Sequence, residues 1–265
     1  NDGLNAVGTQ LKGESFWVAE FLYMILGDFI PLAHWQGDAQ LAQKCQDVRE
    51  SIKRSFECFG WDGEWYLQAT TDAGLPLGSK DNTEGKIFLM PNIWAVISGL
   101  AGPERAHQAM ESVSRYLLKD YGTLLNFPAF TKPRSDIGYV TRYAPGLREN
   151  GGVYTHAATW SVWAYTLMDQ PELAYEAYRR ICPPNRSADI NRYWAEPYVT
   201  PGNIDGPQSE YYGRGGWTWY TGSAQWLHYV ATHWILGIRP REEGLFVDPS
   251  IPAEWQGFKV KRTFR

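Results

Sequence analysis

The 265-residue sequence contains only three cysteines, Cys45, Cys58 and Cys182. They form no Cys-x-x-Cys pair, which argues against a disulfide framework and against a structural zinc site. Isolated thiols of this kind fit small core or surface residues in a reducing compartment, so we expect a cytoplasmic location. We expect no metal centre.

Charge and long apolar runs are also scarce. Charged residues make up 20% of the chain and the net charge is -4, with no basic run, so no nucleic-acid partner is indicated. No secretory signal peptide is visible, and no run of 18 apolar residues predicts a membrane span. The sequence begins with Asn1 instead of an initiator methionine, and residues 1–5 resemble the middle of a loop. We therefore expect a fragment of a longer protein.

Two common catalytic motifs are missing. There is no P-loop for nucleotide phosphates and no GxSxG turn of the α/β-hydrolases. Aromatic residues, in contrast, are abundant, with 13 Trp and 16 Tyr. Their rings bury large areas while keeping a polar group, and they suit the apolar faces of sugar rings. Packing between helices would use the same residues, so the composition leaves both interpretations open.

Apolar residues recur at helical spacing along much of the chain. The first predicted helix starts at Glu14 and is expected to kink or end near Pro31. Turns and short strands are expected over 59–90. The helices come in pairs, joined alternately by short turns and by the long loops 122–152 and 183–216, as in an α/α-barrel with its site in the loops at one end. The further helices are predicted over 38–58, 91–100, 103–121, 154–168, 171–182 and 220–236.

The segment 148–156 brings a cation, a carboxylate and an imidazole together: Arg148, Glu149 and His156. Backbone N–H groups at a helix start, with a His and an Arg nearby, can receive an anion. Two glycines within the segment let the main chain approach a ligand closely. A glycine turn with solvated charges and a structural histidine explains the same residues equally well.

A second helix start offers the Thr221 hydroxyl and free N–H groups at Gly222 and Ser223, again suited to an anion. An ordinary Ser/Thr helix cap is the alternative.

Asp2, in a loop, becomes a general acid if its surroundings raise its pKa, and is otherwise an Asx-turn residue. One acid with two anion-receiving helix starts suits cleavage of a glycosidic bond by phosphate, which is already an anion and needs no protein base. Hydrolysis needs a second carboxylate.

At these residues the chain resembles glycoside hydrolase family 94, the inverting β-glucoside phosphorylases. The resemblance spans nearly the whole chain in the order found in the family. It rests on NDGLN at 1–5, GES at 13–15, EGKIFL at 84–89, WAVISG at 94–99, RYAPG at 142–146, RENGGVYTH at 148–156, EPY at 196–198, WYTGSA at 219–224 and ILGIRP at 235–240.

The resemblance implies a mainly α fold, with 1–237 forming part of an (α/α)6 barrel. A small C-terminal β segment over 238–265 would follow, and residues 245–247 and 258–264 do alternate like strands. The implied activity is phosphorolysis of a β-linked glucosyl disaccharide or oligosaccharide to α-D-glucose 1-phosphate. Inorganic phosphate would be the co-substrate, and no cofactor is implied.

The resemblance also assigns roles to residues of this chain. Asp2 would be the general acid that protonates the glycosidic oxygen. The phosphate ligands of the family correspond to His156, Thr221 and Gly222.

On the acceptor side, the family shapes its subsite where this chain has Tyr143, Arg148 and Glu149. Tyr139 stands where family members differ according to their acceptor, with an acid for cellobiose and a base for cellobionic acid. Tyrosine fits neither. Arg142 is close enough along the chain to bind an acceptor carboxylate.

Family members are much longer than this chain. Their N-terminal half supplies an arginine and an aspartate near the donor sugar and phosphate, so this chain is expected to be incomplete as an enzyme. The expected partners are a small carbohydrate substrate, the missing N-terminal half and, because family members are commonly homodimers, a second copy. No nucleic acid and no membrane are expected.

Three other functions remain open. The string 215–222 is similar to cyclic β-1,2-glucan synthetases, whose phosphorylase-like domain is the first alternative. The second is an inverting hydrolase of the glucoamylase type, with Glu149 or Glu196 as the base opposite Asp2. The third is a carbohydrate-binding fragment without activity.

Overall fold

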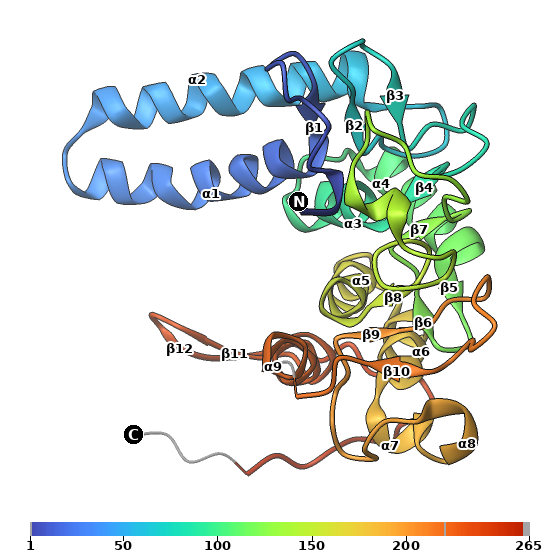
Figure 1. Ribbon diagram of the computed structural model, residues 1–265. Coiled ribbons are helices and arrows are strands. Elements are labelled where there is room, and N and C mark those ends of the chain that lie inside the picture. Colours follow the sequence, from blue (N-terminus) through green and yellow to red (C-terminus); the bar gives the residue numbers. More distant parts are fainter. Residues whose placement is uncertain (1, 220, 262–265) are drawn as a thin grey trace.

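The computed structural model describes residues 2–219 and 221–261, without the side chains of Asp2 and Thr221. The described chain is mostly helical with several small sheets, which confirms the mainly α prediction (Figure 1). The α-helices are α1 Phe16–Trp35, α2 Ala39–Ser55, α3 Leu89–Ile97, α4 Pro103–Ser112, α5 Thr155–Leu167, α6 Pro171–Ile181, α7 Pro183–Arg186, α8 Ile190–Tyr193 and α9 Thr221–Tyr229.

Short helical turns of other types complete these elements. π-helical turns extend α2, α4 and α9 over Phe56–Gly60, Val113–Leu117 and Val230–Ile235. Two 3-10 turns, η1 Asp2–Leu4 and η4 Tyr139–Arg142, contact each other.

The helices are arranged in antiparallel pairs, α1 with α2, α3 with α4 and α5 with α6. The first helices of these pairs and α9 also contact one another in the order α1, α3, α5, α9. The α1–α2 pair extends away from the rest of the molecule in Figure 1. The described residues therefore form a row of inner helices backed by outer ones, as the pairing in the sequence predicted.

Local sequence signals fix several helix starts. The Asp38 carboxylate accepts from Leu41 N–H at 2.9 Å and caps α2. Pro103 and Pro171 occupy the first turn of α4 and α6, where a missing N–H costs nothing.

The first helix does not end at Pro31, because α1 continues through it to Trp35. A proline ring conflicts with the carbonyl four residues earlier, here that of Gly27. Arg49 of α2 packs against this stretch, and its Nε donates to the Tyr23 carbonyl at 3.1 Å. Packing of α2 on α1 thus outweighs the local preference of proline.

By length and composition alone α1 would also suit a membrane span, but it packs against α2 and α3.

Two-residue strands lie directly before the inner helices. β1 leads into α1, β4 into α3 and β8 into α5, and each pairs antiparallel with a strand from a later loop. Three of the small sheets in the described chain therefore lie at the N-terminal ends of the inner helices. The short strands are β1 Glu14–Ser15, β2 Ala69–Thr70, β3 Pro76–Leu77, β4 Ile87–Phe88, β5 Leu118–Lys119, β6 Gly122–Thr123, β7 Asn126–Phe127, β8 Val153–Tyr154, β9 Asn203–Ile204 and β10 Gly215–Gly216.

Tryptophans join the inner helices to one another. Trp17 of α1 stacks on Trp160 of α5 with ring centroids 6.5 Å apart, and Trp94 of α3 meets Trp160 edge to face at 5.2 Å. Trp160 in turn meets Trp226 of α9 at 5.4 Å. These indoles pack between helices, so part of the aromatic content of the sequence serves packing.

The C-terminal prediction is right in one part and wrong in another. Strands β11 Ile238–Arg241 and β12 Gly244–Val247 form an antiparallel hairpin, as the pattern over 245–247 predicted. Residues 258–261 are irregular despite their alternation, and 262–264 lie outside the described chain. Alternation without a neighbouring strand to pair with does not fix a strand.

The long loop 122–152 is held by the buried amide of Asn150. Its Nδ2 donates to the carbonyls of Phe130, at 2.8 Å, and Tyr143, at 2.7 Å, and its Oδ1 accepts from Phe130 N–H at 2.7 Å. The Asn150 carbonyl also accepts from Gly146 N–H at 2.8 Å. One side chain therefore ties three distant points of the loop together.

Asn150→Ala should lower the free energy of unfolding by about 3 kcal/mol, because it leaves several buried backbone groups without partners. Asn185→Ala is the matched control, since Asn185 makes a single exposed bond to the Arg179 carbonyl, and should cost less than about 1 kcal/mol. Denaturant unfolding of both variants measures the difference. Equal losses would refute the role given to Asn150.

Candidate active site

A cavity of about 300 Å³ lies at the N-terminal ends of α1, α3 and α5. The short strands before these helices and the loops paired with them bring its walls together. The cavity is lined by Gly3, Leu4, Trp17, Gln68, Phe88, Met90, Leu125, Asn126, Val140, Glu149, Tyr154, His156, Ala157 and Trp160.

The residues after Asp2 form one wall of this cavity. Gly3 and Leu4 of η1 and Val140 of η4 line it, and a Cβ on Gly3 would come within 3.3 Å of the Val140 Cβ. The Asn5 side chain accepts from Tyr139 N–H at 2.9 Å and fixes the two turns together. The backbone of the candidate acid Asp2 thus starts beside the cavity, while its side chain lies outside the described atoms.

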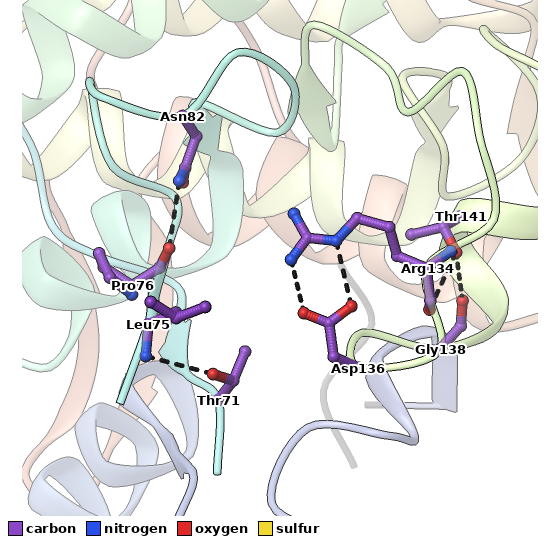
Figure 2. Close-up of polar contacts among 8 residues, drawn as sticks. All are labelled: Thr71, Leu75, Pro76, Asn82, Arg134, Asp136, Gly138 and Thr141. Carbon is purple, nitrogen blue, oxygen red and sulfur yellow. Dashed lines mark hydrogen bonds and ion pairs between the residues drawn. The ribbon is translucent and has the colours of Figure 1, made fainter. Parts of the chain in front are cut away.

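The loop before η4 is fixed by its own polar contacts, which Figure 2 shows. The Arg134 guanidinium binds the Asp136 carboxylate, with Nε to Oδ1 at 3.1 Å. The Thr141 hydroxyl accepts from Arg134 N–H at 2.8 Å and donates to the Gly138 carbonyl at 2.8 Å. Gly138, at φ 124°, takes a backbone conformation that other residues rarely adopt. These bonds set the start of η4, and with it Val140, against η1.

A second set of contacts in Figure 2 fixes the hairpin next to Gln68. Leu75 N–H donates to the Thr71 hydroxyl at 3.2 Å, and Asn82 Nδ2 donates to the Pro76 carbonyl at 3.2 Å. Gln68 N–H itself bonds to the Leu77 carbonyl at 2.9 Å. Gln68 is therefore held at the cavity by a rigid backbone.

His156 and Gly222, two residues to which the family resemblance assigns phosphate binding, lie close together in the structure. His156 lies in the first turn of α5 and Gly222 in the first turn of α9, and a Cβ on Gly222 would lie 3.4 Å from His156 Nδ1. The sheet β10-β9-β8 joins the segments that lead into these two helices. The Thr221 backbone starts α9, but its side chain lies outside the described atoms.

His156 is enclosed by aromatic rings. The ring of Tyr154 stacks on it at 6.0 Å, and Trp160 and Trp226 lie at 4.7 Å and 5.8 Å. This burial lowers the pKa of His156 below its ordinary value of about 6.5, because the imidazolium loses hydration. At neutral pH a neutral imidazole is available to bind a protonated phosphate oxygen or, on gaining a proton, an anion.

Glu149 lines the cavity, and Arg148 lies beside it. The Arg148 guanidinium sits between the rings of Tyr143, at 4.4 Å, and Trp217, at 3.5 Å. Its Nε lies 3.6 Å from Glu149 Oε2, and Glu149 lines the cavity. Asn126 Nδ2 holds the Glu149 carbonyl at 2.8 Å. The structure therefore groups three of the predicted acceptor-side residues, Tyr143, Arg148 and Glu149.

Tyr139 and Arg142 do not line the cavity. Both are exposed on η4, and the Arg142 guanidinium lies 5.0 Å from the Tyr139 ring centroid. They flank Val140, which does line it. Their position is at the outer edge of the site.

Buried polar atoms without hydrogen-bond partners in the described chain also line the cavity. Gln68 leaves both its Oε1 and Nε2 unpaired, Asn126 leaves Oδ1, and Trp17 and Trp160 leave their indole N–H groups. Buried polar groups are normally paired, so donors and acceptors left open around one cavity suit a ligand with many hydroxyl groups. Sequence reasoning missed these four residues. For Gln68 a signal existed, since it is the single polar residue within the buried run 65–69.

The two carboxylates considered as hydrolytic bases are placed differently. Glu149 lines the cavity, whereas Glu196 does not. Hydrogen bonds from its own backbone N–H and from Trp219 Nε1, at 3.0 Å, lower the pKa of Glu196. Within the described part of the chain, no group of three or more His, Cys, Asp or Glu side chains is suited to a metal ion.

The chain matches the Glycosyl hydrolase 94 superfamily, catalytic domain, over residues 1–237. It therefore belongs to this superfamily of enzymes, as its motifs indicated. The α-rich architecture agrees with this assignment, although the described helices do not establish a closed barrel.

Three proteins of similar sequence have known names. Cyclic beta-(1,2)-glucan synthase NdvB of Rhizobium meliloti (strain 1021) is 38% identical over 98% of this chain and 9% of its own length. N,N'-diacetylchitobiose phosphorylase of Vibrio proteolyticus is 36% identical over 100% of this chain and 33% of its own. Solabiose phosphorylase of Paenibacillus borealis is 35% identical over 100% of this chain and 35% of its own. The chain thus spans about a third of the length of these two phosphorylases and 9% of the glucan synthase.

Solved structures share the fold. A sialidase superposes with a TM-score of 0.63 at 11% identity, covering 92% of this chain and 22% of that chain. A glycosidase variant in complex with glucose superposes with a TM-score of 0.50 at 15% identity, covering 83% of this chain and 46% of that chain. At such identities the likeness concerns the fold alone.

The lowered pKa of His156 gives a prediction for stability against pH. In the unfolded chain the imidazole binds its proton near pH 6.5, and in the folded chain only at lower pH. The free energy of unfolding should therefore fall as the pH drops through this window and level off below the folded pKa. His156→Gln should flatten this part of the profile. Unfolding curves of wild type and variant between pH 7.5 and about 5 test it, and parallel profiles would contradict it.

Proposed function

We propose that the parent protein is an inverting β-glucoside phosphorylase, which uses inorganic phosphate to release α-D-glucose 1-phosphate from a β-linked glucosyl disaccharide or oligosaccharide. The observation that supports this most is the close approach of His156 to Gly222 at the N-terminal ends of two neighbouring helices, where a Cβ on Gly222 would lie 3.4 Å from His156 Nδ1. The N-terminal end of a helix offers backbone N–H groups and the positive end of the helix dipole to an anion. His156 lines the same cavity as Gly3, next to the candidate acid.

In this mechanism the Asp2 carboxylic acid donates its proton to the glycosidic oxygen as the bond to the anomeric carbon breaks. Phosphate, held by His156, Thr221 and Gly222, attacks that carbon from the opposite face and inverts its configuration. The attacking oxygen is already anionic, so no protein base is needed. The acceptor sugar leaves with the proton from Asp2, and Tyr143, Arg148 and Glu149 hold it.

Around the sugar, Gln68 and Asn126 are proposed to bind hydroxyl groups, since their open donors and acceptors line the cavity. The proposed complete fold is an (α/α)6 barrel to which 1–237 contributes a part, followed by the β segment at 238–265. A cytoplasmic location is proposed from the isolated cysteines, and a homodimer from the family resemblance.

A second candidate function is the phosphorylase-like domain of a cyclic β-1,2-glucan synthetase. The likeness to the glucan synthase of Rhizobium meliloti, over 98% of this chain, favours it. The inverting hydrolase has less support, because only Glu149 of its two candidate bases lines the cavity and its carboxylate lies 3.6 Å from Arg148.

The full-length parent protein, supplied with phosphate and a panel of β-glucosides, should release glucose 1-phosphate. The panel includes cellobiose, cellobionic acid, a β-1,2-linked glucose disaccharide and N,N'-diacetylchitobiose. Asp2→Asn removes the acid and should lower kcat by about 10²- to 10⁴-fold. Release of free glucose without phosphate would instead support the hydrolase. If neither glucose 1-phosphate nor glucose is released, the carbohydrate-binding protein without activity is the alternative that stands.

Gln68→Leu tests the sugar-binding role of an amide outside the family motifs. Loss of its hydrogen bonds should raise KM for the sugar by about tenfold. The KM for phosphate should stay the same. Because the variant removes a buried amide with no protein partner, the free energy of unfolding should be unchanged or higher. An unchanged sugar KM, or a clear loss of stability, would show that Gln68 serves the fold instead.

A further inference from the structure

Three exposed tryptophans adopt a left-handed backbone conformation: Trp194 at φ 50°, Trp217 at φ 52° and Trp219 at φ 67°. For a bulky residue this conformation is strained and rare. Strained residues of this kind persist where the surrounding structure holds them, often at binding sites. Two of the three, Trp217 and Trp219, lie together in the segment between β10 and α9, just before the proposed phosphate ligands.

Specific contacts hold these two indoles in place. Gly202 N–H donates to the Trp217 carbonyl at 2.9 Å, and the Trp217 ring faces the Arg148 guanidinium at 3.5 Å. Trp219 Nε1 donates to Glu196 Oε1 at 3.0 Å, and its ring meets that of Tyr198 edge to face at 6.2 Å. The segment 196–202 therefore supports both tryptophans.

Tyr198, Trp217 and Trp219 together form what we term the outer aromatic surface. Tyr198 is 73% exposed and Trp219 is 67% exposed, so their rings face solvent, while the hydrogen bond to Glu196 orients Trp219 and the Trp219 ring contacts Tyr198. The surface joins the cavity through Arg148, which lies between Trp217 and Tyr143 and next to Glu149. It therefore continues from the acceptor side of the proposed site.

We propose that the outer aromatic surface binds further sugar units of a β-linked oligosaccharide, beyond the acceptor unit held by Arg148 and Glu149. This inference rests on the proposed phosphorylase function. Indole and phenol rings offer flat apolar faces to the C–H groups of a sugar ring while their polar atoms stay hydrated or bonded. The Glu196 carboxylate beside Trp219 adds an acceptor for sugar hydroxyls. Oligosaccharides, more than disaccharides, are then the preferred substrates.

The experiment uses the full-length parent protein and a length series, from disaccharide to pentasaccharide, of the linkage that it cleaves. In wild type, kcat/KM should rise with length up to the tri- or tetrasaccharide. Trp219→Ala and, separately, Tyr198→Ala should remove most of this gain, about five- to tenfold, while leaving the disaccharide value and the phosphate KM nearly unchanged. Trp35→Ala is the control, since Trp35 is 84% exposed at the far end of α1, and should change neither.

Each outcome separates the two claims. Without glucose 1-phosphate from any substrate in wild type, the proposed function fails, and this inference with it. If the disaccharide is phosphorolysed but kcat/KM does not rise with substrate length, the role of the outer aromatic surface is overturned and the proposed function stands. The same holds if Trp219→Ala and Tyr198→Ala slow all lengths equally or raise the phosphate KM, because the surface would then serve the fold or a protein contact.

Discussion

The site depends first on the buried amide of Asn150, which ties together the loop between β7 and β8. Its bonds to Phe130 and Tyr143 join two parts of the loop whose backbone groups would otherwise lose these partners. The preceding residue, Glu149, is thereby placed at the cavity with its carbonyl held by Asn126. Ordering a loop of this length costs conformational entropy. The fully hydrogen-bonded amide of Asn150 offsets part of that cost next to the cavity.

A second constraint comes from where the helices begin. The inner helices α1, α3 and α5 each follow a two-residue strand, so their N-terminal ends are aligned at one end of the molecule. Helix dipoles there favour an anion, and the rings around His156 make that electrostatic effect stronger by excluding water. The same short strands position Gln68 and Asn126, so the proposed anion site and the proposed hydroxyl-binding groups depend on one architectural feature.

The sequence predicted the helix pairs well, because apolar spacing and proline or Asp caps are local signals. The residues alone suggested two separate anion-receiving helix starts, and the family resemblance assigned His156 and Gly222 to one phosphate site, which stays a prediction. The sequence did not predict that α1 continues past Pro31, since Arg49 of the neighbouring helix decides that. Gln68 and Asn126 were missed for a related reason: each lies in an ordinary stretch of sequence, and only pairing between distant strands brings it to the cavity.

The packed indoles of the inner helices have an optical consequence. Trp163 stacks on Trp234 at 4.7 Å and on Trp226 at 6.4 Å, and Trp160 joins these rings to Trp17 and Trp94. Aromatic transitions this close couple their dipoles, so the near-ultraviolet circular dichroism reports the alignment of α1, α3, α5 and α9 as one unit. Excitation energy also passes readily among such rings, which makes the emission of this protein a property of the assembled helices more than of any single tryptophan.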